Sequence, residues 1–198
     1  RPPPPLASTP VSAVDNPAFC GEVRQASFFY LDRFVLLANG NALYLYSYRI
    51  DREAPAHDAV RAVELRSTYR LRHCWEVPAA HYITRLACPA SYLSPMVVVA
   101  ASDRSLAVLD WASGAEVRRI SDAHERAVTS ISLYEGTPHS SVPAATRDLM
   151  LTAAADGLLK LWDLRAAGCV RSFSGGHTNR VFPIGASLSP CLRYVACG

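Results

Sequence analysis

Lysine is almost absent from this sequence, in which Lys160 is the one lysine beside 19 arginines. The formal net charge is only +3, and the arginines are scattered, with Arg118-Arg119 as the one adjacent pair. A nucleic-acid-binding surface usually carries a dense basic patch or stripe, and none is visible here. The arginines are therefore interpreted as solvated surface residues.

Long hydrophobic runs are also missing. No stretch of 18 or more apolar residues occurs, although half of the 198 residues are hydrophobic. A membrane-spanning helix is therefore not expected, while the chain is long enough to bury a sizeable core. The 14 prolines and the short apolar runs favour many turns and strands over long helices.

The cysteines form no C-x-x-C pair, and their spacing to the histidines fits no usual zinc pattern. The six are Cys20, Cys74, Cys88, Cys169, Cys191 and Cys197. A metal site built from His73, Cys74, His81 and Cys88 is disfavoured, because strand alternation would separate these side chains. With no secretory signal before them, the cysteines are expected to be buried, reduced thiols of an intracellular protein, cytoplasmic or nuclear. No metal or cofactor is expected.

The two ends of the chain lead to a separate expectation. The sequence begins at Arg1 with "RPPPPLASTP", which cannot pack a core, and it stops at "CLRYVACG", inside an expected strand. We expect residues 1–21 to be a Pro-rich disordered segment, and the whole chain to be a fragment that self-associates when expressed alone.

Strand and turn signals begin near residue 27. Two apolar runs flank Asn39-Gly40-Asn41, and Asn-Gly readily adopts the positive φ of a tight hairpin turn. Residues 49–67 are predicted to form a long connection, with a short helix near 58–65, before a strand over 67–77. Further strand–turn–strand patterns follow, with central hairpin turns expected at 102–104 and 155–157.

An internal repeat organises the rest of the chain. Four pairs of residues are each 53 positions apart: Asp103 and Asp156, Asp110 and Asp163, Val117 and Val170, and His124 and His177. His81 precedes His124 by 43 positions, and a polar insert at 134–148 explains the difference. A basic period of 40 to 45 residues with four strands per unit is typical of a β-propeller blade.

The motifs within these repeats resemble those of the WD40-repeat family. "DGLLKLWDL" at 156–164 is similar to its strand ending in Trp-Asp, and "DAHERAV" and "GGHTNRV" are similar to its Gly-His element. The resemblance implies an all-β partial WD40 propeller with about three four-stranded blades and the start of another. The expected blades cover about 22–77, 81–120, 124–173 and 177–198.

In this family the turn Asp, the strand Trp and the Gly-His histidine form a hydrogen-bonded set inside one blade. Here the matching residues are Asp156, Trp162 and His124. The fourth member, a Ser or Thr, is expected where Ala154 stands, with Thr152 as the nearest hydroxyl, so this network is expected to be incomplete.

The other blades depart further from the pattern. In the preceding blade His81 and Asp103 match, but Leu109 replaces the Trp, so at best a partial hydrogen-bonded set is expected. Gly40 and Tyr46 stand at the Asp and Trp positions of the first blade, where no such set is expected. The fourth blade begins with His177.

These residues allow three hypotheses about function to be compared: a hydrolase, a protein-interaction scaffold and a nucleic-acid-associated propeller. No G-x-S-x-G elbow occurs, so a hydrolase is disfavoured and no catalytic residue or small-molecule substrate is expected. Trp75 and Trp111 are interpreted as packing between blades rather than as partner anchors. The prediction is a scaffold for protein–protein interactions, and the alternative is a nucleic-acid-associated propeller that uses the scattered arginines. On the propeller rim that carries the histidines, three arginines are candidate contacts for an acidic partner: Arg104, Arg126 and Arg180.

Overall fold

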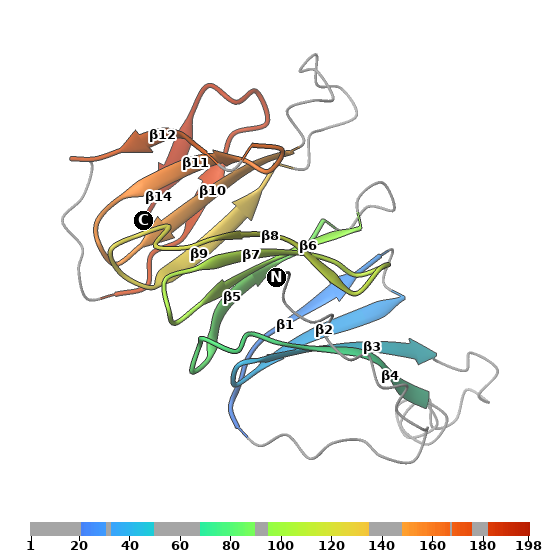
Figure 1. The fold of residues 1–198 in the computed structure, drawn as a ribbon. Coiled ribbons are helices and arrows are strands. Elements are labelled where there is room, and N and C mark those ends of the chain that lie inside the picture. The colour runs from blue at the N-terminus through green and yellow to red at the C-terminus, as the bar shows by residue number, and fades with distance from the viewer. Residues whose placement is uncertain are drawn as a thin grey trace, which may run out of the picture.

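The computed structural model describes residues 21–30, 33–49, 68–89, 95–134, 148–166, 168–175 and 182–198. Within these ranges the chain forms three four-stranded antiparallel sheets and one two-stranded sheet, each built from consecutive strands (Figure 1). This confirms the predicted all-β class with blades of a partial propeller. The described part contains no helix with the length and hydropathy of a membrane span.

The sheets follow one another along the chain. The first contains β1 (Val23–Phe29), β2 (Phe34–Asn39), β3 (Ala42–Arg49) and β4 (Thr68–Glu76). The second contains β5 (Ile83–Ala87), β6 (Met96–Ala101), β7 (Leu106–Asp110) and β8 (Ala115–Ile120). The third contains β9 (Val128–Leu133), β10 (Leu149–Ala154), β11 (Leu159–Asp163) and β12 (Cys169–Phe173). The last sheet is the hairpin of β13 (Ala186–Leu188) and β14 (Val195–Cys197).

The three central hairpins turn at the predicted places, between β2 and β3, β6 and β7, and β10 and β11. Gly40 and Gly157 have φ values of 55° and 81° there, a region that glycine adopts without steric cost. In the central turn of the second sheet, between β6 and β7, the residue with positive φ is Arg104, at 69°. That turn is also held by Asp103, whose carboxylate accepts a hydrogen bond from the backbone N–H of Ser105.

Strand β6 shows why the apolar run "MVVVAA" is buried on both faces. Val97 and Val99 pack in one cluster with Leu36 and Leu45 of the first sheet. Because side chains alternate along a strand, Val98 faces the other way and joins the cluster of the third sheet. The second sheet is therefore covered on both sides, and the hydrophobic core lies between successive sheets.

Hydrogen bonds tie the first strand of each sheet to the first strand of the next. The side-chain amide of Gln25 in β1 donates to the carbonyl of Leu86 in β5 and accepts from the backbone N–H of Leu86, both at 2.9 Å. Arg85 Nε of β5 donates to the carbonyl of Thr129 in β9 at 2.6 Å. The N–H of Ala186 in β13 donates to Ser130 Oγ at 3.2 Å. Polar side chains thus satisfy backbone groups that edge strands would leave open.

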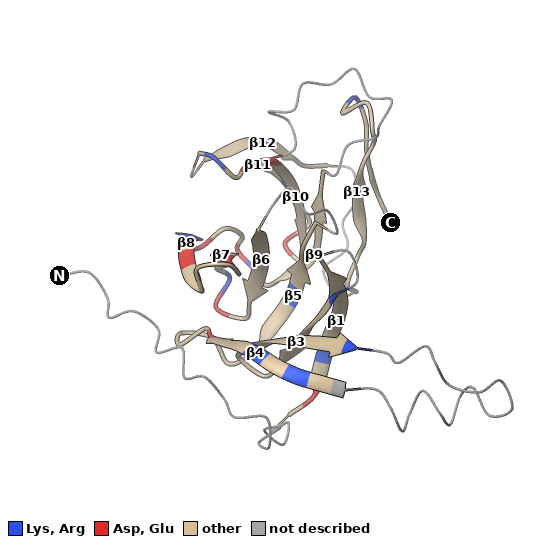
Figure 2. Ribbon diagram, turned by 90° about the vertical axis from the view of Figure 1, so that its right-hand side faces the viewer, with Lys and Arg blue, Asp and Glu red and all other residues tan. Residues whose placement is uncertain are grey.

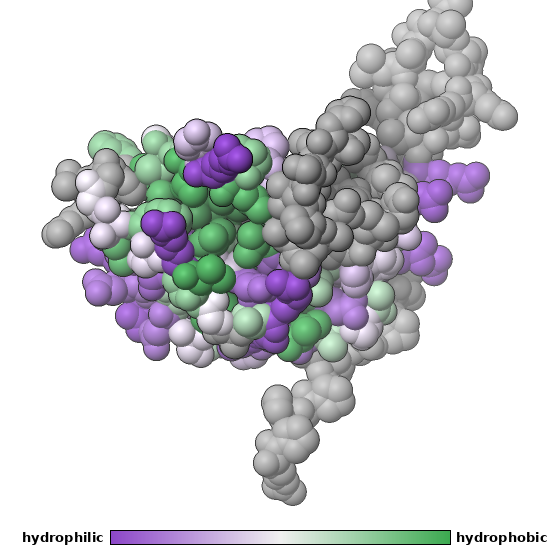
Figure 3. Space-filling view, turned by 90° about the horizontal axis from the view of Figure 1, so that it is seen from above, coloured by the Kyte–Doolittle hydropathy of each residue, from purple (hydrophilic) through white to green (hydrophobic). Residues whose placement is uncertain are grey.

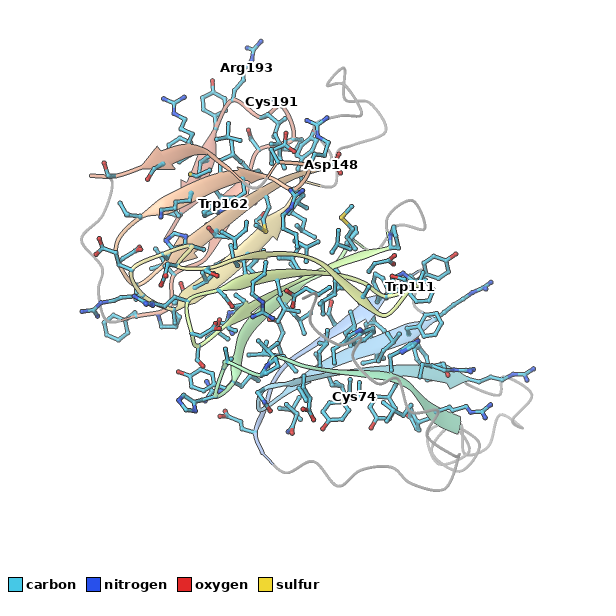
Figure 4. The ribbon with its side chains drawn as sticks, viewed as in Figure 1. Cys74, Trp111, Asp148, Trp162, Cys191 and Arg193 are labelled. Atoms are coloured by element: carbon cyan, nitrogen blue, oxygen red, sulfur yellow. The ribbon has the colours of Figure 1, made fainter. Side chains whose placement is uncertain are left out.

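Trp75 and Trp111 pack between the first and second sheets. Trp75 Nε1 donates to the carbonyl of Gly114 at 3.1 Å, and Trp75 is buried. Trp111 lies 5.7 Å from Phe29 and 5.5 Å from Phe34, between ring centroids, at the end of the second sheet (Figure 4). In the described ranges, Trp111 Nε1 is the one buried side-chain nitrogen or oxygen without a partner.

The expected burial of the cysteines was wrong. Four of the cysteines are exposed and Cys88 is half-buried, although none of these five is in a disulfide. The exposed ones lie on outer strands or near hairpin ends, where no neighbouring sheet covers them: Cys74, Cys169, Cys191 and Cys197. Cys20, the helix expected near 58–65 and the Pro-rich segment up to residue 20 lie outside the described residues.

Apolar side chains gather on the face that Figure 3 shows, over the third sheet and the β13–β14 hairpin. Leu151, Ala153 and Leu159 of the third sheet form a cluster there with Ile184, and Val195 packs against it. Phe182 and Tyr194 beside this cluster are exposed. The third sheet is therefore covered less completely on this side than the second sheet is on either side.

Candidate functional site

A hydrogen-bonded network of four side chains lies inside the third sheet, where Figure 4 labels Trp162. His124 Nδ1 lies 2.9 Å from Asp156 Oδ2, and His124 Nε2 lies 2.8 Å from Thr152 Oγ1. Trp162 Nε1 donates to the same Thr152 oxygen at 2.8 Å. The four side chains form an unbroken chain from the carboxylate to the indole.

The Thr152 hydroxyl corrects the expectation of an incomplete network. Trp162 pairs with Met150 across the β10–β11 register, and Thr152 pairs with Lys160. An aromatic side chain can reach the diagonal neighbour on the adjacent strand, and the indole of Trp162 does so here. The hydroxyl therefore comes from position 152, while Ala154 needs no polar side chain.

Backbone groups complete the coordination of Asp156. Its Oδ1 accepts from the N–H of Leu158 at 2.9 Å, and its Oδ2 accepts from the N–H of Glu125 at 3.1 Å. A buried carboxylate is tolerated when donors surround it, and Asp156 has three. The same carboxylate thus forms the β10–β11 turn and fixes the loop that carries His124.

Burial sets the protonation of the pair. Burial lowers the pKa of the His124 imidazole below its ordinary value, although the nearby Asp156 carboxylate opposes that change. Burial raises the pKa of Asp156, but the Leu158 N–H and the His124 ring outweigh it, so the pKa is lowered overall. The favoured state is a neutral imidazole beside an ionised carboxylate. Nδ1–H then donates to Asp156, and Nε2 accepts the Thr152 hydroxyl proton.

The one lysine of the chain joins this network from its margin. Lys160 Nζ donates to the carbonyl of Ala123 at 2.6 Å, next to His124 in the loop before β9. Its ammonium group lies 5.8 Å from the centroid of the Trp162 ring. Lys160 stands out in the sequence as the one lysine, but its contact with this network was not predicted, although its position two residues before Trp162 in β11 was a usable signal.

The network has no free group for chemistry. His124 is 1% exposed, Thr152 0% and Trp162 4%, so solvent does not reach the imidazole. Both imidazole nitrogens are engaged, and a general base needs a free lone pair within reach of its substrate. Within the described residues, no group of three or more His, Cys, Asp or Glu side chains could hold a metal ion.

In the second sheet the corresponding residues do not form this network. The side chain of His81 is exposed, and it is the backbone N–H of His81 that bonds to Ser102 Oγ, at 3.0 Å. Asp103 Oδ1 accepts from the Ser105 hydroxyl at 2.7 Å, and Asp103 Oδ2 lies 3.9 Å from Arg119 Nη1. Leu109 stands where the third sheet has its tryptophan, and it is buried.

The first sheet departs from the pattern as the sequence indicated. Gly40 forms the turn and lacks a carboxylate, and Tyr46 is buried at the place of the tryptophan. Burial raises the pKa of the Tyr46 hydroxyl, with the nearby Cys74 as a second cause. His177, which would begin the fourth blade, lies outside the described residues.

Two of the three candidate rim arginines can be placed. Arg104 Nη2 lies 2.6 Å from Asp122 Oδ1, and both side chains remain largely exposed. Arg126 is exposed in the loop that carries His124. Because Arg104 belongs to the β6–β7 turn, the structure brings both to the side of the molecule that holds these turns. Arg180 lies outside the described residues.

The three four-stranded antiparallel sheets, one of which contains a His–Thr–Asp–Trp network, are consistent with blades of a partial β-propeller of the WD40 type. No family model matches the chain. It is similar to the probable coatomer subunit beta' of Schizosaccharomyces pombe, with 35% identity over 72 residues. The match covers 36% of this chain and 8% of the coatomer protein, so the chain spans a small part of that relative's length.

Proposed function

We propose that this chain is part of a WD40-repeat propeller that acts as a scaffold for protein–protein interactions and catalyses no reaction of its own. The observation that carries the proposal is the closed network of His124, Thr152, Asp156 and Trp162. These are the residue types that could support acid–base catalysis, yet each polar group is buried and engaged inside the sheet. The four side chains hold the β10–β11 turn and the loop that carries His124 in place, and these loops are then available to contact partner proteins.

The proposed domain organisation follows the sequence. Residues 1–21 form a Pro-rich segment, and the propeller begins near residue 22, with blades at about 22–77, 81–120, 124–173 and 177–198. The order of its loops also resembles the C-terminal part of WD repeat-containing protein 27, which we propose as the nearer relationship. An intracellular location, cytoplasmic or nuclear, is supported by five described cysteines that form no disulfide.

The proposed partner surface is the rim that carries Arg104, Arg126 and Arg180. A guanidinium group binds a carboxylate with two parallel hydrogen bonds, so arginines on one rim favour an acidic segment of a partner protein. The Arg104–Asp122 pair is exposed, and an exposed ion pair is weak enough to exchange for a partner's carboxylate. No membrane or small-molecule partner is part of this proposal.

The test is capture of partners by the intact protein with and without charge reversal at the rim. Arg104→Glu, Arg126→Glu and Arg180→Glu together should weaken capture of the leading partner and leave the melting curve unchanged. Arg171→Glu, an exposed change on β12, is the matched control. Undiminished capture by the triple variant would remove the rim from the proposal. Salt-dependent retention on a nucleic-acid column would favour the nucleic-acid alternative instead.

A further inference from the structure

The outermost strand of the first sheet, β4, has an open edge. The strand order is β1-β2-β3-β4, and no further strand pairs with β4 in the described part of the chain. β4 is nine residues long, which makes it the longest strand described. An edge strand presents a row of backbone N–H and C=O groups that can pair with a strand from another chain.

Three arginines lie at one end of this edge. Arg70 of β4 pairs with Ser47 of β3, and Arg49 pairs with Thr68 on the same side of the sheet. The β3–β4 register is irregular next to Arg72. Arg72 lies close to the Ser47 side chain, and its Nε donates to Ser47 Oγ at 2.8 Å. Figure 2 shows these positively charged positions as bands on β4 and at the tip of β3.

Among the described residues, these arginines lack the carboxylate partners that other arginines have. Arg104, Arg119 and Arg165 each lie within an ion-pair distance of a carboxylate. In the described part of the chain, Arg49 and Arg70 have no such carboxylate, and the hydrogen bond of Arg72 goes to the Ser47 hydroxyl. All three are exposed. Like charges gathered on one edge repel each other, and an anionic group from outside would relieve that repulsion.

The other face of the same edge is aromatic. Tyr69 lies between Thr68 and Arg70, so strand alternation places it on the opposite side, and it is 62% exposed. It pairs with Tyr48, whose ring lies 5.9 Å from that of Phe28. A strand added to β4 would therefore meet arginines on one face and aromatic rings on the other.

We propose that the β4 edge binds an extended acidic peptide by strand addition. Its backbone pairs with the open edge, its Glu or Asp side chains at alternate positions pair with Arg70 and Arg72, and an apolar side chain between them packs on Tyr69. This surface is distinct from the rim of Arg104 and Arg126. The competing interpretation is that the arginines keep β4 from pairing with any other strand, as charges on edge strands often do.

The test uses fluorescein-labelled peptides of roughly eight residues with alternating Glu and Val. Fluorescence anisotropy gives their Kd for the 198-residue chain. Arg70→Glu with Arg72→Glu should weaken binding about tenfold, because two attractive contacts become repulsive. Arg171→Glu, on the edge strand of the third sheet, should leave the Kd within about twofold of the parent value.

Two changes in the peptide test the mode of binding without any protein variant. A Gln-for-Glu peptide removes the charge, and N-methylation at alternate residues, in either phase, removes backbone donors. The Gln-for-Glu peptide should bind more weakly, and the N-methylated peptide whose lost N–H groups face β4 should bind much more weakly than the one whose lost N–H groups face away. Equal binding of both N-methylated peptides would overturn strand addition, and an unchanged Kd after the double reversal would overturn the role of the arginines. Tighter binding of a uridine-rich RNA, with the same dependence on Arg70 and Arg72, would replace the peptide by a phosphate-bearing ligand.

Discussion

The second and third sheets have the same four strands and the same turn, yet their interiors differ in chemistry. Val99 and Leu109 occupy the places that Thr152 and Trp162 hold one repeat later, and all four are buried. The second sheet is stabilised there by apolar packing alone. The third sheet buries a hydroxyl, an indole and an imidazole, and every one of them has a partner. A blade interior accepts either solution, because Thr152 and Trp162 bond to each other while Val99 and Leu109 have no side-chain polar group to pair.

Both sheets have an aspartate in the central turn, and in both it makes the same bond to the turn backbone. Asp103 accepts from the backbone N–H two residues later, at 3.0 Å, and Asp156 does the same at 2.9 Å. This local bond needs neither a histidine nor a tryptophan. The aspartate is therefore first a turn residue, and its bond to His124 is an addition that only the third sheet has.

Trp162→Ala should produce the largest effect on this comparison. It removes a buried aromatic side chain and leaves the Thr152 hydroxyl without its indole donor. We expect a loss of about 3 to 5 kcal/mol in the free energy of unfolding, measured by chemical denaturation. Val170→Ala, an exposed change on β12, is the control and should stay within about 0.5 kcal/mol. A Trp162→Ala value within error of the parent would show that the network does not stabilise the sheet.

His124→Ala should cost less, about 1 to 3 kcal/mol, because it leaves Asp156 and Thr152 with unsatisfied groups in a buried place. The matched change in the second sheet is His81→Ala. The His81 side chain is exposed, so this variant should change the free energy of unfolding by no more than about 0.5 kcal/mol. Equal losses for the two variants would mean that both histidines act alike, contrary to their geometry.

The repeat was predictable from the sequence because turn residues and strand residues recur at a fixed interval of 53. The residue that supplies the hydroxyl was not predictable. Thr152 and Ala154 are two residues apart on β10, so their side chains lie on the same face of the sheet. Only the β10–β11 register shows that the Trp162 indole reaches diagonally to Thr152. The exposure of Cys74 and Cys169 also depended on which sheet faces are covered, which no local pattern encodes.

Thr152→Val would give the third sheet the residue that the second sheet has. The change keeps the shape but removes the oxygen that links His124 and Trp162, so we expect a loss of about 1 to 2 kcal/mol. The double variant Thr152→Val with His124→Ala should lose less than the sum of the two single losses, because they break the same network. Additive losses in a denaturation cycle would show that the two side chains stabilise the sheet independently.

The smallest expected effect is on pH dependence, and it follows from the lowered pKa of His124. As the pH falls below the ordinary histidine value of 6.5, the unfolded chain takes up a proton at this position that the folded chain does not. The free energy of unfolding should therefore decrease on acidification, by at most about 1.4 kcal/mol per pH unit for this one group. Asp156 acts in the same direction but at lower pH: its lowered pKa contributes stability that is lost only as the pH falls below its ordinary value of 3.8. Denaturation between about pH 5 and 7.5 thus isolates the histidine. His124→Asn should flatten the slope while His81→Asn keeps it, and a slope unchanged by His124→Asn would show that the imidazole is not held neutral by the network.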